Sequence, residues 1–364
     1  MAGLRILFLD SWLRDRSSGS GSAVAIAGLA AGLESLGHEV TVLRPERVFP
    51  SLDVTRLLYN AGLGRRLAGF DPDLVVGFDL DGSLLNPGST RAPYVVALKG
   101  VMADEARFET GAFRRRFKLL APLEARNARS ADRVICTSVY SARQALREYG
   151  VQRERMRIVP EGIDVSAWSA VSRQAADLRA GGGRGATILS VARQYRRKNT
   201  ASLLRAIVRL RDSRPDVRLR IIGEGPELSR LSALSTQLGL SDSVRFVGSV
   251  EGIEALQREY AVADVFCLPS LQEGFGIVFL EAMAAGLPIV AARAGAAPEV
   301  APHGEVSLLV NPDDDAALAR ALERLLADDG LRRKLGEVGA RRWRSYDWPI
   351  VASRFLSACF PVGE

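Results

Sequence analysis

Short apolar runs alternate with amphipathic segments along most of the chain. The runs have the length of β-strands, and the segments between them repeat apolar residues with the period of a helix. Strands that are apolar throughout are typical of parallel sheets with both faces covered. The pattern therefore predicts an α/β fold with mostly parallel, doubly wound sheets. We expect strands at 4–9, 38–43, 74–77, 94–98, 133–137, 157–159, 187–191, 219–222, 244–247, 264–268, 289–292 and 308–310.

The segments between these strands predict helices and a division into two domains. The expected helices lie at 23–36, 112–130, 141–149, 200–213, 227–238, 253–260, 277–285 and 314–328, and most of 332–360 is helical in pattern. Periodicity weakens between 165 and 185, where a glycine run indicates a flexible linker. We expect one domain at 1–165, a linker at 166–185, a second domain at 186–345, and a helix at 346–364 that crosses back to the first domain. Ligands bind outside the carboxyl ends of such strands, so two facing domains would enclose a cleft.

Composition supports a soluble protein with two domains. The length of 364 residues favours two domains over a single core. Hydrophobic residues make up 47% and charged residues 25%, which is typical of globular proteins. The sequence has neither an apolar run long enough to span a membrane nor the apolar segment of a signal peptide. Cys136, Cys267 and Cys359 lack metal-ligand spacing and indicate buried thiols, so we expect a cytoplasmic protein.

The net charge of +7 does not by itself indicate a nucleic-acid partner. The basic residues are spread along the chain, and no nucleic-acid-binding motif accompanies them. We therefore expect no nucleic acid. Only four of the 49 basic residues are lysines, so a lysine at a candidate site is unusual in this chain; they are Lys99, Lys118, Lys198 and Lys334.

The stretch 268–290 combines a buried strand end, a glycine-bearing turn and a helix. Gly274 and Gly276 lie where the helix begins. A helix N-terminus offers unpaired N–H groups and the positive end of a dipole, which suit a phosphate, and glycine allows a ligand to approach the backbone closely. Glu273 and Glu281 would repel a phosphate, so we expect them to bind hydroxyl groups. The stretch indicates a ligand that carries both phosphate and sugar.

A second candidate loop follows the first strand of the second domain. Arg193 leaves the strand end, and Lys198 precedes the next helix. A guanidinium and an ammonium there can neutralise a diphosphate, although a solvated basic loop is the alternative. The position of this loop at the same sheet edge as Glu273 favours the ligand. Glu224 follows the next strand, in a loop that would either lie along the nucleotide or only turn the chain. Val250 ends a further strand segment at that edge, where backbone amides could meet a base.

The loop after the first strand of the chain is also rich in glycine. It ends in Gly19-Ser20-Gly21, which does not match the dinucleotide fingerprint G-x-G-x-x-G. A flexible loop and a ligand cradle explain it equally well.

The order and spacing of these pieces resemble the retaining glycosyltransferases of family 4. The resemblance covers most of 186–330, and the Glu-x7-Glu element is specific in that setting. The matching segments are VARQYRRKNT, IIGEGPEL, VRFVGSV, ADVFCLPSLQEGFGIVFLEAMAAGLPIVA and GEVSLLVNPDDDAALARAL, with looser matches at LESLGHEV, ADRVICTS and RIVPEGID. The resemblance implies the GT-B fold, in which two Rossmann-like domains face a central cleft. The first domain would bind the acceptor and the second the nucleotide-sugar donor.

The resemblance also implies a role for each donor-site residue. Arg193 and Lys198 would bind the donor diphosphate, and Glu273 would bind hydroxyls of the donor sugar. Glu281 would bind the ribose hydroxyls. The other residues expected at the donor, mostly through their backbone, are Gly19, Gly21, Glu224, Val250, Gly274, Phe275, Gly276 and Ile277. The family needs neither a metal nor another cofactor, which suits a site that neutralises pyrophosphate with basic side chains and a helix N-terminus.

One position departs from the family. Many relatives carry a histidine-glycine pair after the fourth strand of the first domain, where this chain has Lys99-Gly100. Lys99 would stabilise the leaving phosphate, contact a sugar hydroxyl, or be an exposed strand end. With Lys99, the residues expected to act in catalysis are Glu273, Arg193 and Lys198. The implied reaction is transfer of a hexosyl-type sugar with retention, without the covalent intermediate of paired-carboxylate enzymes.

The acceptor is expected to be a glycan, a lipid-linked molecule or a small molecule. Arg114, Arg115, Arg116 and Lys118 share a predicted helix with apolar residues. They would either contact the inner face of the cell membrane, which would make the protein peripheral there, or form a solvated helix face. The acids within 79–81 end a strand and could meet an acceptor hydroxyl.

Two other functions compete with sugar transfer. A non-catalytic protein that binds nucleotide sugars or carbohydrates is favoured by Lys99 at the histidine position. A GT-B epimerase of nucleotide sugars is the other alternative, although the acid and histidine set expected of it is missing.

Overall fold

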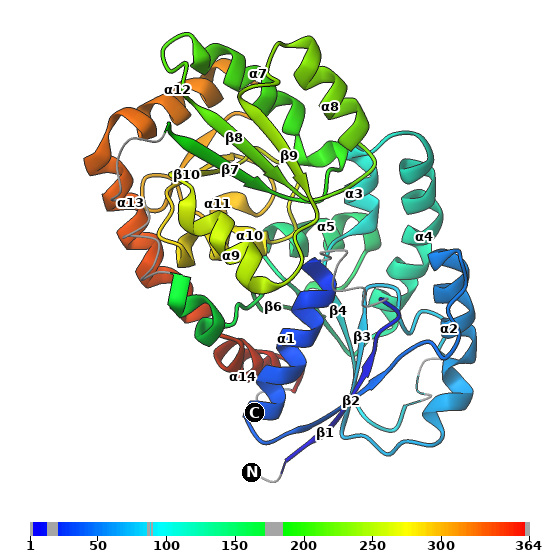
Figure 1. The fold of residues 1–364 in the computed structure, drawn as a ribbon. Helices are drawn as coiled ribbons and strands as arrows, with labels where there is room; N and C mark the ends of the chain where they lie inside the picture. The colour runs from blue at the N-terminus through cyan, green and yellow to red at the C-terminus, as the bar shows by residue number, and fades with distance from the viewer. Residues whose placement is uncertain (1–2, 13–20, 86–87, 89, 172–184, 361–364) are drawn as a thin grey trace. The chain divides into compact units, whose positions relative to one another are not determined.

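The chain forms two compact units. The computed structural model describes residues 3–12, 21–85, 88, 90–171 and 185–360. The first unit contains the N-terminal strand, Ser22–Gly162 and the residues from Trp348 onward, and the second contains Ile163–Asp347. After Gly162 the chain thus enters the second unit, and at Trp348 it returns to the first. Each unit consists of a parallel sheet with helices packed on it and is described by itself (Figure 1).

A six-stranded parallel sheet forms the centre of the first unit, with the order β2-β1-β3-β4-β5-β6. All residues of β3 and β4 are buried, as expected for central strands that are apolar throughout. The strands are β1 (Arg5–Leu9), β2 (Glu39–Leu43), β3 (Leu74–Phe78), β4 (Tyr94–Leu98), β5 (Arg133–Cys136) and β6 (Met156–Ile158).

Helix α14 returns to the first unit and packs on α1 (Figure 1). A Cβ atom on Gly28 of α1 would lie 2.0 Å from the ring of Trp348, and one on Gly32 would lie 2.6 Å from the Trp348 carbonyl oxygen. The missing side chains of these glycines leave the space that α14 occupies. The helices of this unit are α1 (Gly21–Ser35), α2 (Leu52–Leu67), α3 (Met102–Phe108), α4 (Gly111–Ser130), α5 (Val139–Tyr149) and α14 (Trp348–Cys359).

The second unit has its own six-stranded parallel sheet, with the order β12-β11-β10-β7-β8-β9. Its strands are β7 (Thr187–Val191), β8 (Arg218–Ile222), β9 (Val244–Gly248), β10 (Val265–Leu268), β11 (Ile289–Ala292) and β12 (Ser307–Val310). Its helices are α7 (Thr200–Arg211), α8 (Leu228–Gln237), α9 (Ile253–Val262), α10 (Ile277–Ala284), α11 (Ala297–Val300), α12 (Asp315–Ala327) and α13 (Asp329–Arg342). The predicted α/β class with two doubly wound domains is confirmed.

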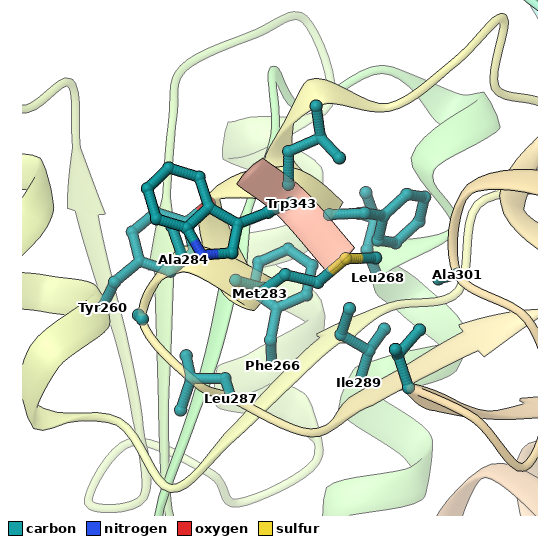
Figure 2. Close-up of a cluster of buried hydrophobic side chains, with 14 of the residues drawn as sticks. Tyr260, Phe266, Leu268, Met283, Ala284, Leu287, Ile289, Ala301 and Trp343 are labelled. Atoms are coloured by element: carbon teal, nitrogen blue, oxygen red, sulfur yellow. The ribbon is translucent and has the colours of Figure 1, made fainter. Parts of the chain in front are cut away.

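An aromatic cluster fixes α9 and α10 on the second sheet (Figure 2). The rings of Tyr260 and Phe266 are stacked, with their centroids 5.7 Å apart. Trp343 and Met283 are fully buried in the same cluster. Burial of such a side chain stabilises the fold by about 1.5–3 kcal/mol, so the two helices are held firmly. Helix α10 carries the candidate residues Ile277 and Glu281.

Helices α2 and α3 were not predicted from the sequence. Helix α2 buries Arg56 and Asn60, whereas Leu57 and Leu58 are exposed. Sequence periodicity identifies a helix when its apolar residues face the core. Because α2 has polar residues on its buried side, the usual pattern is absent. Helix α3 spans only Met102–Phe108, which is too short for a clear period.

The crossing between the units differs from the expected boundary at 165. The chain enters the second unit at Ile163, and Trp168 and Val171, placed in the expected linker 166–185, are buried in the core of that unit. Ile163 also forms an isolated parallel bridge with Asp347, so the two crossing segments are paired. The glycine run at 181–183 lies outside the described residues.

Candidate functional site

The sheet of the second unit changes its winding direction between β7 and β10. The chain proceeds from β7 through β8 and β9 to one edge, and from β10 through β11 and β12 to the other. In open parallel sheets, ligands bind at such a switch point, outside the carboxyl ends of the strands. The loops that follow the two central strands are 192–199 and 269–276. They contain Arg193, Lys198 and Glu273.

Lys198 and Glu273 are brought into direct contact. Lys198 Nζ donates a hydrogen bond of 2.6 Å to Glu273 Oε1, and the Ser270 hydroxyl donates to the same oxygen over 2.8 Å. The two charged side chains are only 15% and 8% exposed. The ion pair therefore connects the loop after β7 to the loop after β10.

Backbone hydrogen bonds hold the Glu273 loop from two sides. Leu271 N–H donates to the carbonyl of Arg197 over 2.7 Å, and Ala296 N–H donates to the carbonyl of Glu273 over 3.0 Å. Gly295 packs so closely that a Cβ atom on it would lie 2.5 Å from Glu273 N, and its φ of +57° is in the left-handed region. Glycine at 295 therefore allows the Glu273 loop to lie against the segment after β11.

The Arg193 loop is joined in the same way to the loop after β8. The buried Gln194 donates its N–H to the carbonyl of Glu224 over 2.9 Å and accepts at its own carbonyl from Glu227 N–H over 2.9 Å. The Glu224 side chain is exposed. The guanidinium carbon of Arg193 lies 5.8 Å from the centroid of the Tyr195 ring, within cation–π range. The backbone thus places Arg193 and Glu224 in neighbouring loops at one sheet edge.

Helix α10 begins without a side-chain cap. Gly276 precedes it with φ +93°, and a Cβ atom there would lie 2.7 Å from the Phe279 ring. Gly276 has no side chain that could cap the first turn of α10. Uncapped N–H groups at a helix N-terminus are suited to an anion. Phe275 is 5% exposed, and its ring centroid lies 6.0 Å from that of Tyr346. The Phe275 side chain packs in the core, so the backbone is the part of this residue that a ligand could contact.

Glu281 on α10 is paired with Tyr260 on α9. The Tyr260 hydroxyl donates to Glu281 Oε2 over 2.6 Å. Burial raises the pKa of Glu281 to about 7, although the hydrogen bond from Tyr260 opposes the shift. Within the described part of the chain, Oε1 has no hydrogen-bond donor. Glu281 therefore has one oxygen fixed by the protein and one available to a ligand hydroxyl.

The structure gives fewer contacts for the remaining donor-site candidates. Val250 is partly buried against the core of the second unit. Gly21 is the first residue of α1, and Gly274 lies in the turn between Glu273 and Phe275. Gly19 lies outside the described residues.

Lys99 lies at the end of β4 in the first unit and is not an exposed strand end. Its Nζ is 3.1 Å from both carboxylate oxygens of Glu161, and the two side chains are 7% and 6% exposed. Its backbone N–H donates to Asp79 Oδ1 over 2.7 Å. The exposed-strand alternative is therefore wrong, and Lys99 is part of a buried ion pair.

The acids within 79–81 are buried rather than directed at an acceptor. Asp79 accepts from Trp12 Nε1 over 3.1 Å, and Asp81 accepts from Ser11 N–H over 2.7 Å. Burial raises the pKa of Asp79 to about 6. Both carboxylates fix the chain at the ends of β1 and β3, which corrects the expectation that they contact an acceptor hydroxyl.

The basic residues of α4 differ in their surroundings. Arg114, Arg115 and Lys118 are exposed. Arg116 instead forms an ion pair with Asp53 of α2, with 2.8 Å between Arg116 Nη2 and Asp53 Oδ1. Among the described helices, none combines the length and apolar character needed to cross a membrane. Arg116 therefore links α4 to α2 instead of extending the basic face.

Several supporting residues were not found from the sequence. Ser270, Tyr260, Gly295 and Glu161 contact predicted site residues but match no motif by themselves. Only the position of Ser270, three residues before Glu273, could have suggested its contact. In the described ranges, no group of three or more His, Cys, Asp or Glu side chains is arranged to hold a metal.

Two family models match consecutive parts of the chain. The model of glycosyl transferases group 1 matches residues 181–342, and the model of Glycosyltransferase Family 4 matches residues 19–167. The first match contains the whole switch-point site, and the second contains Lys99 and Glu161.

Named relatives and solved structures agree with these matches. The chain is 32% identical over 338 residues to the MMP alpha-(1->4)-mannosyltransferase of Mycolicibacterium hassiacum, which covers 86% of this chain and 80% of that protein. It is 39% identical over 202 residues to the phosphatidyl-myo-inositol mannosyltransferase of Mycobacterium leprae, covering 54% of this chain and 51% of that one. Sucrose-phosphate synthase from Thermosynechococcus elongatus superposes with a TM-score of 0.81 over 97% of this chain and 98% of that chain. At 22% identity this likeness concerns the fold alone.

Proposed function

This chain belongs to the group 1 glycosyltransferases of family 4, and on that premise we propose that it is a metal-independent, retaining hexosyltransferase. The donor is a nucleotide-diphosphate sugar, and the acceptor is a hydroxyl of a glycan, a lipid-linked molecule or a small molecule. Because both named relatives are mannosyltransferases, a mannosyl donor is the first candidate.

The contact between Lys198 and Glu273 carries this proposal. A nucleotide sugar presents a diphosphate and a neutral, hydroxylated ring next to each other. The ammonium and the carboxylate, 2.6 Å apart at the switch point, offer adjacent sites of matching chemistry. On donor binding, the Lys198 ammonium exchanges the carboxylate for a phosphate oxygen, and Glu273 becomes free to accept from sugar hydroxyls.

The same residues favour departure of the diphosphate. In the transfer, the bond from the anomeric carbon to the phosphate oxygen breaks, and a bond to the acceptor oxygen forms on the same face. The leaving phosphate takes the acceptor's proton. Negative charge grows on the phosphate as it leaves, and Arg193, Lys198 and the N-terminus of α10 stabilise that charge. These groups supply the positive charge that a divalent metal provides in other enzymes.

Release of nucleoside diphosphate tests the proposal. The protein is incubated with GDP-mannose, UDP-glucose and ADP-glucose, each with water-soluble and lipid acceptors and with EDTA. We expect release that depends on an acceptor and persists in EDTA, and a product whose anomeric configuration, determined by NMR, equals that of the donor. Inversion of configuration would reject the retaining mechanism, and loss of activity in EDTA would reject metal independence.

Two variants connect the reaction to the site. Lys198→Ala and Glu273→Gln should each lower kcat/KM at least about 100-fold, because each removes a charged contact worth about 3 kcal/mol to the transition state. Lys334→Ala is the matched control, since Lys334 is an exposed lysine of the same unit. Equal activities of Lys198→Ala and Lys334→Ala would refute the assignment.

A non-catalytic sugar-nucleotide binder is the second candidate. The observation that favours it is the Lys99–Glu161 ion pair, which occupies the position where many relatives have a histidine. Thermal shift measurements with the same donors distinguish the two, because binding raises the melting temperature whether or not transfer occurs. A donor-induced shift without release with any acceptor would support this candidate. Interconversion of donor sugars without an acceptor would support the epimerase instead.

We also propose that the first unit contacts an anionic membrane surface through α2 and α4. Leu57, Leu58 and Leu119 are 38%, 52% and 76% exposed, and Arg114, Arg115 and Lys118 are exposed on α4. The ion pair between α2 and α4 places the two sets of side chains on neighbouring helices. Apolar side chains flanked by basic ones suit the interface of a bilayer that contains acidic lipids.

Vesicle flotation tests the membrane contact. We expect the protein to float with vesicles that contain phosphatidylglycerol and to remain unbound with vesicles of phosphatidylcholine alone. Salt at about 0.5 M should release the protein from the acidic vesicles, because screening weakens the electrostatic attraction. A Leu57→Ser, Leu58→Ser variant and an Arg114→Ser, Arg115→Ser variant should each lose binding. Leu146→Ser, at a 45% exposed leucine of α5, is the control. Equal binding to both vesicle types would reject the charge-based contact.

A further inference from the structure

Glu273 Oε1 accepts hydrogen bonds from two different loops. Lys198 Nζ, in the loop after β7, donates over 2.6 Å, and the Ser270 hydroxyl, in the same loop as Glu273, donates over 2.8 Å. Ser270 is 2% exposed and Glu273 is 6% exposed. Among the described residues, no donor contacts Glu273 Oε2. The protein therefore occupies one oxygen of this carboxylate and leaves the other to a ligand.

The two donors differ in how easily they can leave the carboxylate. The ammonium of Lys198 is at the end of a flexible four-carbon chain and comes from another loop. Ser270 has a short side chain and lies three residues before Glu273. The next residue, Leu271, donates its N–H to a carbonyl of the neighbouring loop over 2.7 Å, which fixes the backbone there. The serine hydroxyl can therefore stay on Oε1 when the ammonium moves away.

A diphosphate would compete with Glu273 for the ammonium of Lys198. When Lys198 turns to a phosphate oxygen, a largely buried carboxylate loses a charge-assisted hydrogen bond. A buried acceptor without a donor is costly, most of all when it is charged. The hydrogen bond from Ser270 avoids this cost at Oε1, so it makes the exchange of partners by Lys198 more favourable.

We propose that Ser270 is a positioning residue, whose hydroxyl holds Glu273 Oε1 while Lys198 exchanges the carboxylate for the donor diphosphate. A fixed Oε1 also fixes the orientation of the carboxylate, so that Oε2 remains available to the sugar. This inference rests on the proposed transferase function, in which the same exchange occurs. Ser270 acts on the donor only through Glu273, and all three residues belong to the second unit.

The test measures the affinities of GDP, UDP, ADP and dTDP by calorimetry, together with the melting temperature of each variant. We expect Ser270→Ala to bind the preferred nucleotide at least about tenfold more weakly than wild type, because Glu273 Oε1 has no donor after Lys198 leaves. Ser270→Thr retains the hydroxyl and should bind within about threefold of wild type. Ser307→Ala is the control with unchanged affinity, since it removes a buried hydroxyl of the same unit that donates to the Ala301 carbonyl over 2.7 Å.

The neutral variant Glu273→Gln separates positioning from a purely structural role. An amide holds the Lys198 ammonium only weakly, so nucleotide binding no longer deprives a charged group of its donor. In this background, Ser270→Ala should change the affinity by less than about twofold. Equal affinities of wild type and Ser270→Ala, or the same loss in both backgrounds, would overturn the inference and leave the proposed function standing. Wild-type protein that binds none of these nucleotides would reject the proposed function and this inference with it.

Discussion

The pKa of Glu281 should make donor binding depend on pH. The Glu281 carboxyl group has a pKa of about 7, raised by burial, and its Oε2 already accepts from Tyr260. If the ribose hydroxyls donate to Oε1, they bind the ionised form. Protonation then competes with the donor, and affinity falls as the pH drops through 7.

The magnitude follows from the fraction of Glu281 that is ionised. With a pKa of about 7, that fraction falls from roughly nine-tenths at pH 8 to roughly one-tenth at pH 6. Donor affinity should therefore fall about tenfold, or about 1.4 kcal/mol, over this interval. Glu281→Gln removes the titration and the charge, so its affinity should be about tenfold lower than wild type at pH 8 and nearly constant with pH.

Calorimetric titration with a nucleotide sugar at about pH 6, 7 and 8, on both sides of the Glu281 pKa, checks this expectation. A nucleotide sugar is preferable to a free nucleoside diphosphate, whose terminal phosphate titrates in the same range. Tyr260→Phe provides a second check: it removes a hydrogen bond that lowers the pKa of Glu281, so the midpoint should move to higher pH. A wild-type pH dependence that persists in Glu281→Gln would refute the reasoning.

Three further outcomes are expected. Gly276→Ala should weaken donor binding at least about tenfold while the protein stays folded, because alanine at φ +93° is strained and its Cβ meets a ring. Burial raises the pKa of Glu124 to about 8. The contribution of the protonated Glu124 carboxyl to the free energy of unfolding is therefore fully present below its ordinary pKa of 4.5, and it declines by about 1.4 kcal/mol per pH unit up to about pH 8. Glu124→Gln should make the melting temperature depend less on pH over that range. Gly28→Ala should lower the melting temperature because its Cβ would lie 2.0 Å from Trp348, whereas Gly62→Ala, with open space around it, should raise stability by up to about 1 kcal/mol. Equal effects of the two glycine replacements would contradict the packing argument.

The sequence predicted the strands and the contact at the centre of the candidate site for the same reason. Buried parallel strands consist of apolar runs, so their positions and their carboxyl ends follow directly from the pattern. Lys198 and Glu273 follow two strands that are central in the sheet, and the expectation that they share one edge agrees with their 2.6 Å contact. Local sequence also marked Gly276, because a glycine before a helix needs no distant partner to be recognised.

Partners from distant segments could not be predicted. Tyr260 reaches Glu281 only because α9 and α10 pack on one aromatic cluster, and Glu161 reaches Lys99 only because β4 and the segment after β6 end at the same edge. The sequence pattern did not predict helix α2, for a different reason. Its buried side is polar, so the rule that apolar residues face inward gives the wrong answer there.

The first unit is completed by the last segment of the chain. Helix α14 fills the space above the glycines of α1, although the whole second unit separates them in sequence. During synthesis, the second unit is a continuous segment that can fold before α14 has left the ribosome, whereas the first unit must wait with the α1 surface uncovered. Premature termination near residue 347 should therefore yield an aggregation-prone product rather than an independent catalytic half. Circular permutation that joins α14 directly ahead of β1 would let the first unit fold as one continuous segment.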